Sequence, residues 1–355
     1  MDKNIVKKDD RFLYNKKDRE QLRADLAEED FARKTCSFYR YILIEKPELV
    51  RDQLYRDWSD LKIFGRIYIA NEGINAQLSC PEKNWDLFIK TMNSRDYLKD
   101  VSLKKAIQDG ASFYKLVIKI KDEIVNYNID KDEFDMNQVG KHLTPKEFND
   151  KLEENNTLVV DMRNYYESEV GQFENAIIPD VDTSRELLPE VRKLLADHEN
   201  DEILLYCTGG IRCEKASAYL IHHRFKHVNQ LNGGIIQYAS DVKSKGLKSK
   251  FIGKNFVFDD RMGERITEDI IGKCHQCEQP ADRHLDCGND ACHILFIQCD
   301  ECYKIYSGCC SKECEAFSKL PIEKQRVLRK DPDKVVSNAR YSSRIKPKLA
   351  DIRQS

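Results

Sequence analysis

The sequence predicts a multidomain α/β protein in which an α+β domain, an α/β domain and a cysteine-rich module follow one another. Three observations lead to this prediction. A chain of 355 residues exceeds one typical hydrophobic core, so two or three domains are expected. Segments with strand-like and helix-like periodicity alternate over most of the chain. Nine of the thirteen cysteines lie after residue 270.

Shifts in composition place the boundaries between the parts. The tail carries eleven Lys or Arg residues against four acidic ones. It either binds nucleic acid by neutralising phosphates or is a solvated, disordered end. The N-terminal arm is dense in charged residues, and we assign it no function. We expect the polar arm at 1–34, a first domain at 35–135, a second at 140–245, a cysteine-rich module at 256–318 and the basic tail at 319–355.

The overall composition excludes few partners. Charged residues make up 34% of the chain and the net charge is −2, so the global charge neither implies nor excludes a polyanionic partner. The chain has no apolar run of about eighteen residues and starts with polar ones, so we expect neither a membrane span nor a signal peptide. Thirteen cysteines without an export signal indicate metal ligands and catalytic thiols in a cytoplasmic protein.

The first domain shows the element order βαββαβ, which is that of the ferredoxin-like, or acylphosphatase-like, fold. A sheet of this kind can bind RNA through exposed aromatic and basic residues, but it often only packs, and we favour packing here. Strands are predicted at 36–44, 64–70, 74–79 and 113–120. The two helices are expected to bury Leu49, Val50, Leu54 and Trp58 in the first and Trp85, Phe88, Ile89 and Met92 in the second.

The second domain begins with a helix-start signal. Thr144 is the expected N-cap, Pro145 occupies the first helical position and Glu147 completes a capping box. Three strands then alternate with two helices, which predicts an α/β layout around a mostly parallel sheet. The strands are expected at 158–161, 203–206 and 228–231, and the helices at 187–195 and 214–225.

The candidate active site is the turn between the second of these strands and the helix that begins near Arg212. Cys207 stands where the strand ends, so unpaired backbone N–H groups and the positive end of the helix dipole favour its thiolate. Glycines in the turn let the backbone close around the sulfur. The predicted chemistry is a cysteine nucleophile held by amides. The catalytic candidates are Cys207 and Arg212, and the loop residues are Thr208, Gly209, Gly210 and Ile211.

Cys213 has two interpretations. It could resolve Cys207 as a disulfide, or it could pack inside the helix as a small apolar residue. Six residues separate the two cysteines across a tight loop, and we expect their sulfurs to face apart, which favours packing.

The cysteine-rich module has the spacing of metal ligands. Two C-x-x-C pairs, about twenty residues apart, fit tetrahedral thiolate coordination of zinc. Four pairs in sequence could interleave, first with third and second with fourth, to hold two ions. A metal-free cluster or disulfides are the alternatives, and His275, His284 or His293 could replace a thiolate. The candidate ligands are Cys274, Cys277, Cys287, Cys292, Cys299, Cys302, Cys310, next to Cys309, and Cys314.

Several motifs resemble those of the rhodaneses, in which the cysteine corresponding to Cys207 carries a persulfide. Residues 159–163, Glu167, Gly171 and 176–179 are similar to the run that opens a rhodanese domain, and 231–235 to the element that closes it. Phosphatases with a related loop place an arginine six residues after the cysteine. This chain has Cys213 there and its arginine one residue earlier, and the smaller ring suits a terminal sulfur better than a phosphate.

Three stretches together resemble the bacterial rhodanese-domain tRNA uridine hydroxylases: residues 68–76, 206–216 and 256–261. The resemblance covers about residues 35–318. It implies oxygen-dependent hydroxylation of the wobble uridine in the tRNA anticodon loop to 5-hydroxyuridine, with molecular oxygen as co-substrate and Cys207 as the essential cysteine. The sequence has no flavin or NAD motif and no recognisable two-histidine iron site, so it identifies no electron donor.

Two other functions remain open. A sulfurtransferase would pass persulfide sulfur from Cys207 to a small molecule, a protein or tRNA, and the loop alone predicts this activity. A binding adaptor without enzymatic activity would not need an activated thiol, so the intact Cys207 argues against it.

Overall fold

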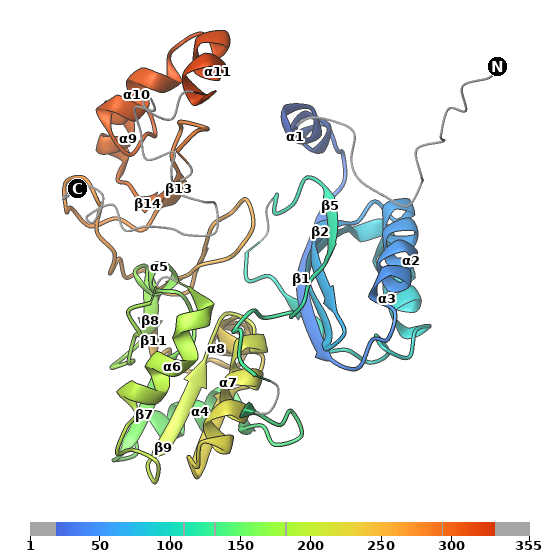
Figure 1. Ribbon diagram of the computed structural model, residues 1–355, viewed down its shortest axis with the longest axis vertical. Coiled ribbons are helices and arrows are strands. Elements are labelled where there is room, and N and C mark those ends of the chain that lie inside the picture. Colours follow the sequence, from blue (N-terminus) through green and yellow to red (C-terminus); the bar gives the residue numbers. More distant parts are fainter. Residues whose placement is uncertain (1–18, 109–110, 131–132, 182, 293, 331–355) are drawn as a thin grey trace. The chain divides into compact units, whose positions relative to one another are not determined.

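The computed structural model describes residues 19–108, 111–130, 133–181, 183–292 and 294–330. The chain divides into two compact units (Figure 1). Unit 1 runs to Asn126 and includes Asp259–Arg261, and unit 2 comprises Tyr127–Phe258 and the chain from Met262 onward. Most of the predicted N-terminal arm and of the basic tail lies outside the described residues. Among the described residues, no helix is both long and apolar enough to cross a membrane.

Unit 1 is built on a five-stranded sheet with the strand order β4-β1-β3-β2-β5. Strand β3 pairs antiparallel with β1 and β2, and β2 pairs parallel with β5. The predicted order βαββαβ is confirmed, and β4 is an additional short edge strand. The elements are α1 (Arg19–Ala27), β1 (Arg33–Tyr41), α2 (Pro47–Asp60), β2 (Phe64–Ala70), β3 (Gly73–Pro81), η1 (Glu82–Asn84), α3 (Trp85–Asn93), β4 (Lys104–Lys105) and β5 (Leu116–Ile120).

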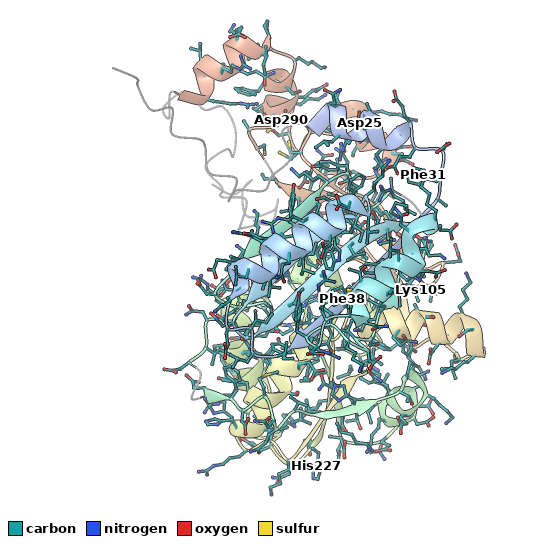
Figure 2. The ribbon with its side chains drawn as sticks, turned by 90° about the vertical axis from the view of Figure 1, so that its right-hand side faces the viewer. Asp25, Phe31, Phe38, Lys105, His227 and Asp290 are labelled. Carbon is teal, nitrogen blue, oxygen red and sulfur yellow. The ribbon has the colours of Figure 1, made fainter. Side chains whose placement is uncertain are left out.

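Helices α2 and α3 cover one face of this sheet. In Figure 2 they lie in front of the strands, with Phe38 labelled between them. Phe38 of β1 contacts Trp58 of α2, which in turn contacts Phe88 of α3, and all three are buried. Leu49 was predicted on the buried stripe but is 55% exposed. It lies nine residues before Trp58, which at 3.6 residues per turn is on roughly the opposite side of the helix.

Unit 2 contains a four-stranded parallel sheet with the order β6-β10-β9-β7, which confirms the predicted α/β layout. The predicted capping box is present, because Thr144 Oγ1 accepts from the Glu147 N–H at 3.3 Å and Glu147 Oε2 accepts from the Thr144 N–H at 2.8 Å. The elements are β6 (Lys141–Leu143), α4 (Pro145–Leu152), β7 (Thr157–Asp161), α5 (Tyr165–Ser168), α6 (Ser184–Leu194), β9 (Glu202–Tyr206), α7 (Ile211–His222), β10 (His227–Leu231) and α8 (Gly234–Lys245).

The rest of unit 2 consists of short strands and helices. Strands β8 (Gly171–Phe173), β11 (Phe251–Asn255) and β12 (Glu264–Arg265) form a small antiparallel sheet. A side chain at Gly171 would collide with the backbone of Lys254, so this close approach of β8 and β11 requires glycine. The cysteine-rich part contains β13 (His284–Asp286), β14 (Leu295–Ile297), α9 (Asp300–Tyr306), α10 (Lys312–Ser318) and α11 (Ile322–Lys330).

Candidate active site and cysteine clusters

The Cys207 sulfur lies at the N-terminus of α7. The N–H of Gly210, the N-cap residue, donates to Cys207 Sγ at 3.1 Å, and the backbone N–H groups of Arg212 and Cys213 also bond to the sulfur. Gly210 has a φ of 96°, which favours glycine. A Cβ on Gly209 would instead meet no atom within 4 Å. The prediction that a glycine is needed here to let the backbone close around the sulfur is therefore wrong for Gly209. The structure thus brings the predicted cysteine and amides together.

These donors make Cys207 acidic although it is fully buried. Burial works against ionisation, but the Cys213 thiol, the charge of Arg212 and the backbone N–H groups together lower the pKa of Cys207 to about 6. At pH 7 roughly nine-tenths of such a thiol is thiolate, which is the nucleophilic form. The geometry therefore provides a thiolate at neutral pH.

Cys213 is placed differently from the prediction. Its side chain forms a hydrogen bond with Cys207, so the expectation that the two sulfurs face apart is wrong. Cys213 is the third residue of α7, and side chains on a helix lean toward its N-terminus. This lean carries the Cys213 thiol back to the loop. Burial and the bond to Cys207 raise the pKa of Cys213 well above its usual value, so it remains a protonated donor.

A buried ion pair fixes Arg212 beside the loop. Its two terminal nitrogens donate to the two carboxylate oxygens of Glu167 at 2.6 and 2.9 Å. The Thr208 hydroxyl joins the pair, 3.3 Å from Glu167 Oε2 and 3.1 Å from Arg212 Nη2. The Glu167 side chain is fully buried, and its charge raises the pKa of Arg212 well above the usual value despite burial. Arg212 is therefore a fixed cation next to the thiolate.

The motif residues before Glu167 form a second buried network. Arg163 donates to both carboxylate oxygens of Asp161 and, at 2.6 Å, to the carbonyl oxygen of Gly171. The hydroxyls of Ser168 and Tyr206 donate to Asp161 Oδ2 at 2.8 and 2.7 Å. This network anchors the short helix α5, which carries Glu167, to the end of β7.

Three further contacts complete the site, and only the first involves a residue outside every motif singled out in the sequence. Buried Tyr127 donates through its hydroxyl to the carbonyl oxygen of Arg212 at 3.3 Å, and it lies ahead of the predicted second domain. The N–H of Ile235 donates to the Cys207 carbonyl at 3.0 Å, and the preceding Gly234 approaches the loop so closely that any Cβ would collide with it. The ring of Phe258, 38% exposed, lies 5.9 Å from the Arg212 guanidinium.

The cysteines of the C-terminal part form two groups of four. Within each group the sulfur atoms lie within 4.8 Å of one another. The Sγ atoms of Cys277 and Cys299, and those of Cys292 and Cys310, are 3.6 Å apart. Tetrahedral zinc with bonds of about 2.3 Å requires roughly 3.8 Å between sulfurs, so both groups fit such an ion. Cluster 1 is Cys274, Cys277, Cys299 and Cys302, and cluster 2 is Cys287, Cys292, Cys310 and Cys314.

The pairs therefore interleave, first with third and second with fourth. Cys309 lies outside both clusters, with its sulfur 3.8 Å from the Ser318 hydroxyl. Neither cluster includes His275 or His284, and His293 lies outside the described residues. His275 instead bonds through Nε2 to Glu169 Oε1 at 3.0 Å. Four thiolates leave no open position, so such an ion would be structural.

We expect the alkylation of Cys207 to depend on Cys213. In the wild type the rate should rise with pH to half its plateau near pH 6, because only the thiolate reacts. In Cys213→Ala the midpoint should move upward, toward the ordinary thiol pKa of 9.0, since one donor to the thiolate is lost. Cys213→Ser keeps a donor and should stay near the wild type. Iodoacetamide labelling, quantified on the Cys207 peptide by mass spectrometry, measures this. An unchanged midpoint in Cys213→Ala would contradict the assigned hydrogen bond.

Three known protein families match successive parts of the chain. A UPF0176 acylphosphatase like domain matches residues 33–124, a rhodanese-like domain matches 144–241, and a family described as rhodanase C-terminal matches 252–315. These matches confirm the predicted fold class.

Proteins named tRNA uridine(34) hydroxylase are similar over most of the chain. The one from Leptospira interrogans is 53% identical over 342 residues, 96% of this chain and 93% of that protein. Those from Yersinia enterocolitica and Pectobacterium atrosepticum are 49% and 48% identical, over 89% of this chain and 91% and 90% of theirs. The resemblance predicted from the three motifs is confirmed, and the chain belongs to the tRNA uridine(34) hydroxylase family.

Proposed function

We propose that this chain hydroxylates uridine 34, the wobble uridine of the tRNA anticodon loop, at carbon 5, with dioxygen as co-substrate and Cys207 as the essential thiolate. Two lines support the proposal: the name shared by relatives about half identical in sequence, and the cysteine site itself. The observation that carries most weight is that the Cys213 thiol, the charge of Arg212 and the backbone amides of Cys213 and Arg212 lower the pKa of Cys207 to about 6. A group activated in this way serves covalent chemistry.

The residues of the site suit addition to a uracil ring. A Cys207 thiolate that bonds to carbon 6 would move an electron pair toward carbon 5 and the neighbouring carbonyl, which makes carbon 5 the nucleophile. Arg212, held by Glu167, would stabilise the negative charge that develops. Hydroxylation by dioxygen places one oxygen atom on the ring and reduces the other to water. The reaction therefore also consumes two electrons and two protons from a reductant.

A sulfurtransferase is the second candidate, and the match to the rhodanese-like domain favours it. A persulfide on Cys207 would place its terminal sulfur among the same amides. The bond between the two sulfurs would then break as an acceptor nucleophile takes the outer one, and Cys207 would leave as thiolate. The two candidates differ in the product they leave on tRNA.

We expect tRNA from cells lacking this protein to lose hydroxylated uridine 34. The modification should return with the wild type and not with Cys207→Ser, because a serine hydroxyl is not ionised at neutral pH. Nucleoside analysis by accurate-mass spectrometry measures this. Adding oxygen and exchanging oxygen for sulfur give the same nominal mass, so the resolution must separate them. A thiolated uridine that depends on Cys207, or an unchanged nucleoside profile, would contradict the hydroxylase.

We infer that each cysteine cluster holds one structural zinc ion. The sulfur spacing fits tetrahedral thiolate coordination, and the sets of four cysteines leave no site for a substrate. All four residues of cluster 2 are buried, whereas Cys277 of cluster 1 is exposed. Bound zinc would cross-link the segments that carry the paired cysteines, and so contribute directly to folding.

The metal content of single variants tests this inference. The purified wild type should contain about two zinc ions per chain, one per cluster. Cys277→Ser and Cys310→Ser should each lose one ion, and both should lower the unfolding temperature. Cys309→Ser is the matched control, because Cys309 belongs to neither cluster, and it should keep both ions. A metal-free wild type prepared under reducing conditions, or a Cys277→Ser variant that retains two ions, would contradict the assignment.

A further inference from the structure

The sheet of unit 1 has a second face, opposite to helices α2 and α3. Side chains alternate between the two faces of a strand. Phe38, Ile67 and Ala76 belong to the core beneath the helices. Their neighbours Tyr39, Tyr68 and Asn75 therefore lie on the opposite face. Unlike the core positions, all three are partly accessible to solvent.

Strand register brings these side chains into rows. Tyr39 of β1 is opposite Asn75 of β3, Asn75 is opposite Tyr68 of β2, and Tyr68 is opposite Lys119 of β5. One step along the sheet, Ser37, Gln77, Arg66 and Val117 form a parallel row. Neither row contains an acidic residue. We call Tyr39, Tyr68, Asn75, Gln77, Arg66 and Lys119 the tyrosine face.

The tyrosines of this face are already paired with cations. The ammonium of Lys104 lies 4.4 Å from the centre of the Tyr39 ring, and that of Lys121 lies 5.7 Å from the Tyr68 ring. Arg66 and Lys119 are exposed. Between the tyrosines, the side-chain amide of Gln77 donates to that of Asn75 at 2.7 Å. The face thus combines aromatic rings, positive charge and amide groups.

This combination fits unpaired RNA. Bases that are not in a duplex stack on aromatic side chains, amides bond to their edges, and lysine or arginine neutralises the phosphates. One strand separates Tyr39 from Tyr68, which sets the two tyrosines roughly 10 Å apart across the sheet, wide enough for each to take its own base. A paired stem keeps its bases stacked on one another and cannot use the rings.

We propose that the tyrosine face binds unpaired nucleotides of the tRNA anticodon loop, with bases stacked on Tyr39 and Tyr68. This rests on the proposed function, which makes the anticodon loop the substrate. It revises the expectation that the first domain serves only for packing. The face lies within unit 1, whereas Cys207 belongs to unit 2, so recognition and chemistry reside on separate units of the chain.

Binding of the full-length protein to an anticodon stem-loop RNA tests the proposal. Tyr39→Leu and Tyr68→Leu keep an apolar strand residue but remove the ring, and each should weaken binding about 5- to 150-fold. Tyr39→Phe and Tyr68→Phe keep the ring and should bind like the wild type.

The positive charges of the face are tested by the salt dependence of binding. Lys119→Gln should make the slope of the log binding constant against log salt concentration shallower by the share of about one phosphate contact. Lys90→Gln is the control, because Lys90 is exposed on α3, which covers the other face. A fully paired hairpin of equal length should bind weakly.

Three results would overturn the proposal: leucine variants that bind like the wild type, a paired hairpin that binds as tightly as the loop, or equal effects of Lys90→Gln and Lys119→Gln. Misfolding is detected separately, because both tryptophans of the chain, Trp58 and Trp85, report on unit 1 by fluorescence. Binding of the anticodon loop without any hydroxylation would refute the proposed function but leave the RNA-binding role of the tyrosine face intact. Hydroxylation with an unchanged KM in the leucine variants would refute RNA binding by the tyrosine face and leave the proposed function intact.

Discussion

The ion pair between Glu167 and Arg212 is the constraint on which the Cys207 loop depends. Both carboxylate oxygens of a fully buried Glu167 accept from Arg212, and the hydroxyl of Thr208 bonds to the same group. A buried charge without its partner costs about 3–5 kcal/mol, so the pair holds Arg212 in one place. From there the guanidinium lowers the pKa of Cys207, together with the Cys213 thiol and the amides at the start of α7.

Glu167 is held in turn from two sides, although α5 is only four residues long. On one side, Ser168 bonds to Asp161, which is locked by Arg163. On the other side, the residues that follow α5 reach cluster 1. Val170 packs with Cys274 and Cys302, and Glu169 bonds to His275. The cysteine-rich module therefore supports α5 directly, so the zinc ion proposed for cluster 1 would stabilise the helix that carries Glu167.

Local patterns in the sequence predicted local structure well. The capping box at Thr144 and the strand–loop–helix around Cys207 depend on neighbouring residues, and cysteine spacing alone allowed the interleaved pairing. Contacts between distant segments could not be predicted. Nothing in the sequence indicates that Tyr127 reaches Arg212, and the motif at 231–235 marked Gly234 without indicating that it packs against the Cys207 loop. The orientation of the Cys213 thiol depends on where α7 begins, one residue before the predicted start near Arg212.

The proposed function requires that oxygen from dioxygen enters uridine 34 in a reaction that depends on Cys207. Growth of cells under dioxygen enriched in oxygen-18, followed by accurate-mass analysis of uridine 34, tests it most directly. We expect one heavy oxygen in each hydroxylated uridine made by the wild type, and no hydroxylated uridine in cells carrying Cys207→Ser. Unlabelled hydroxyl oxygen, which would come from water, or sulfur in its place would contradict hydroxylation by dioxygen.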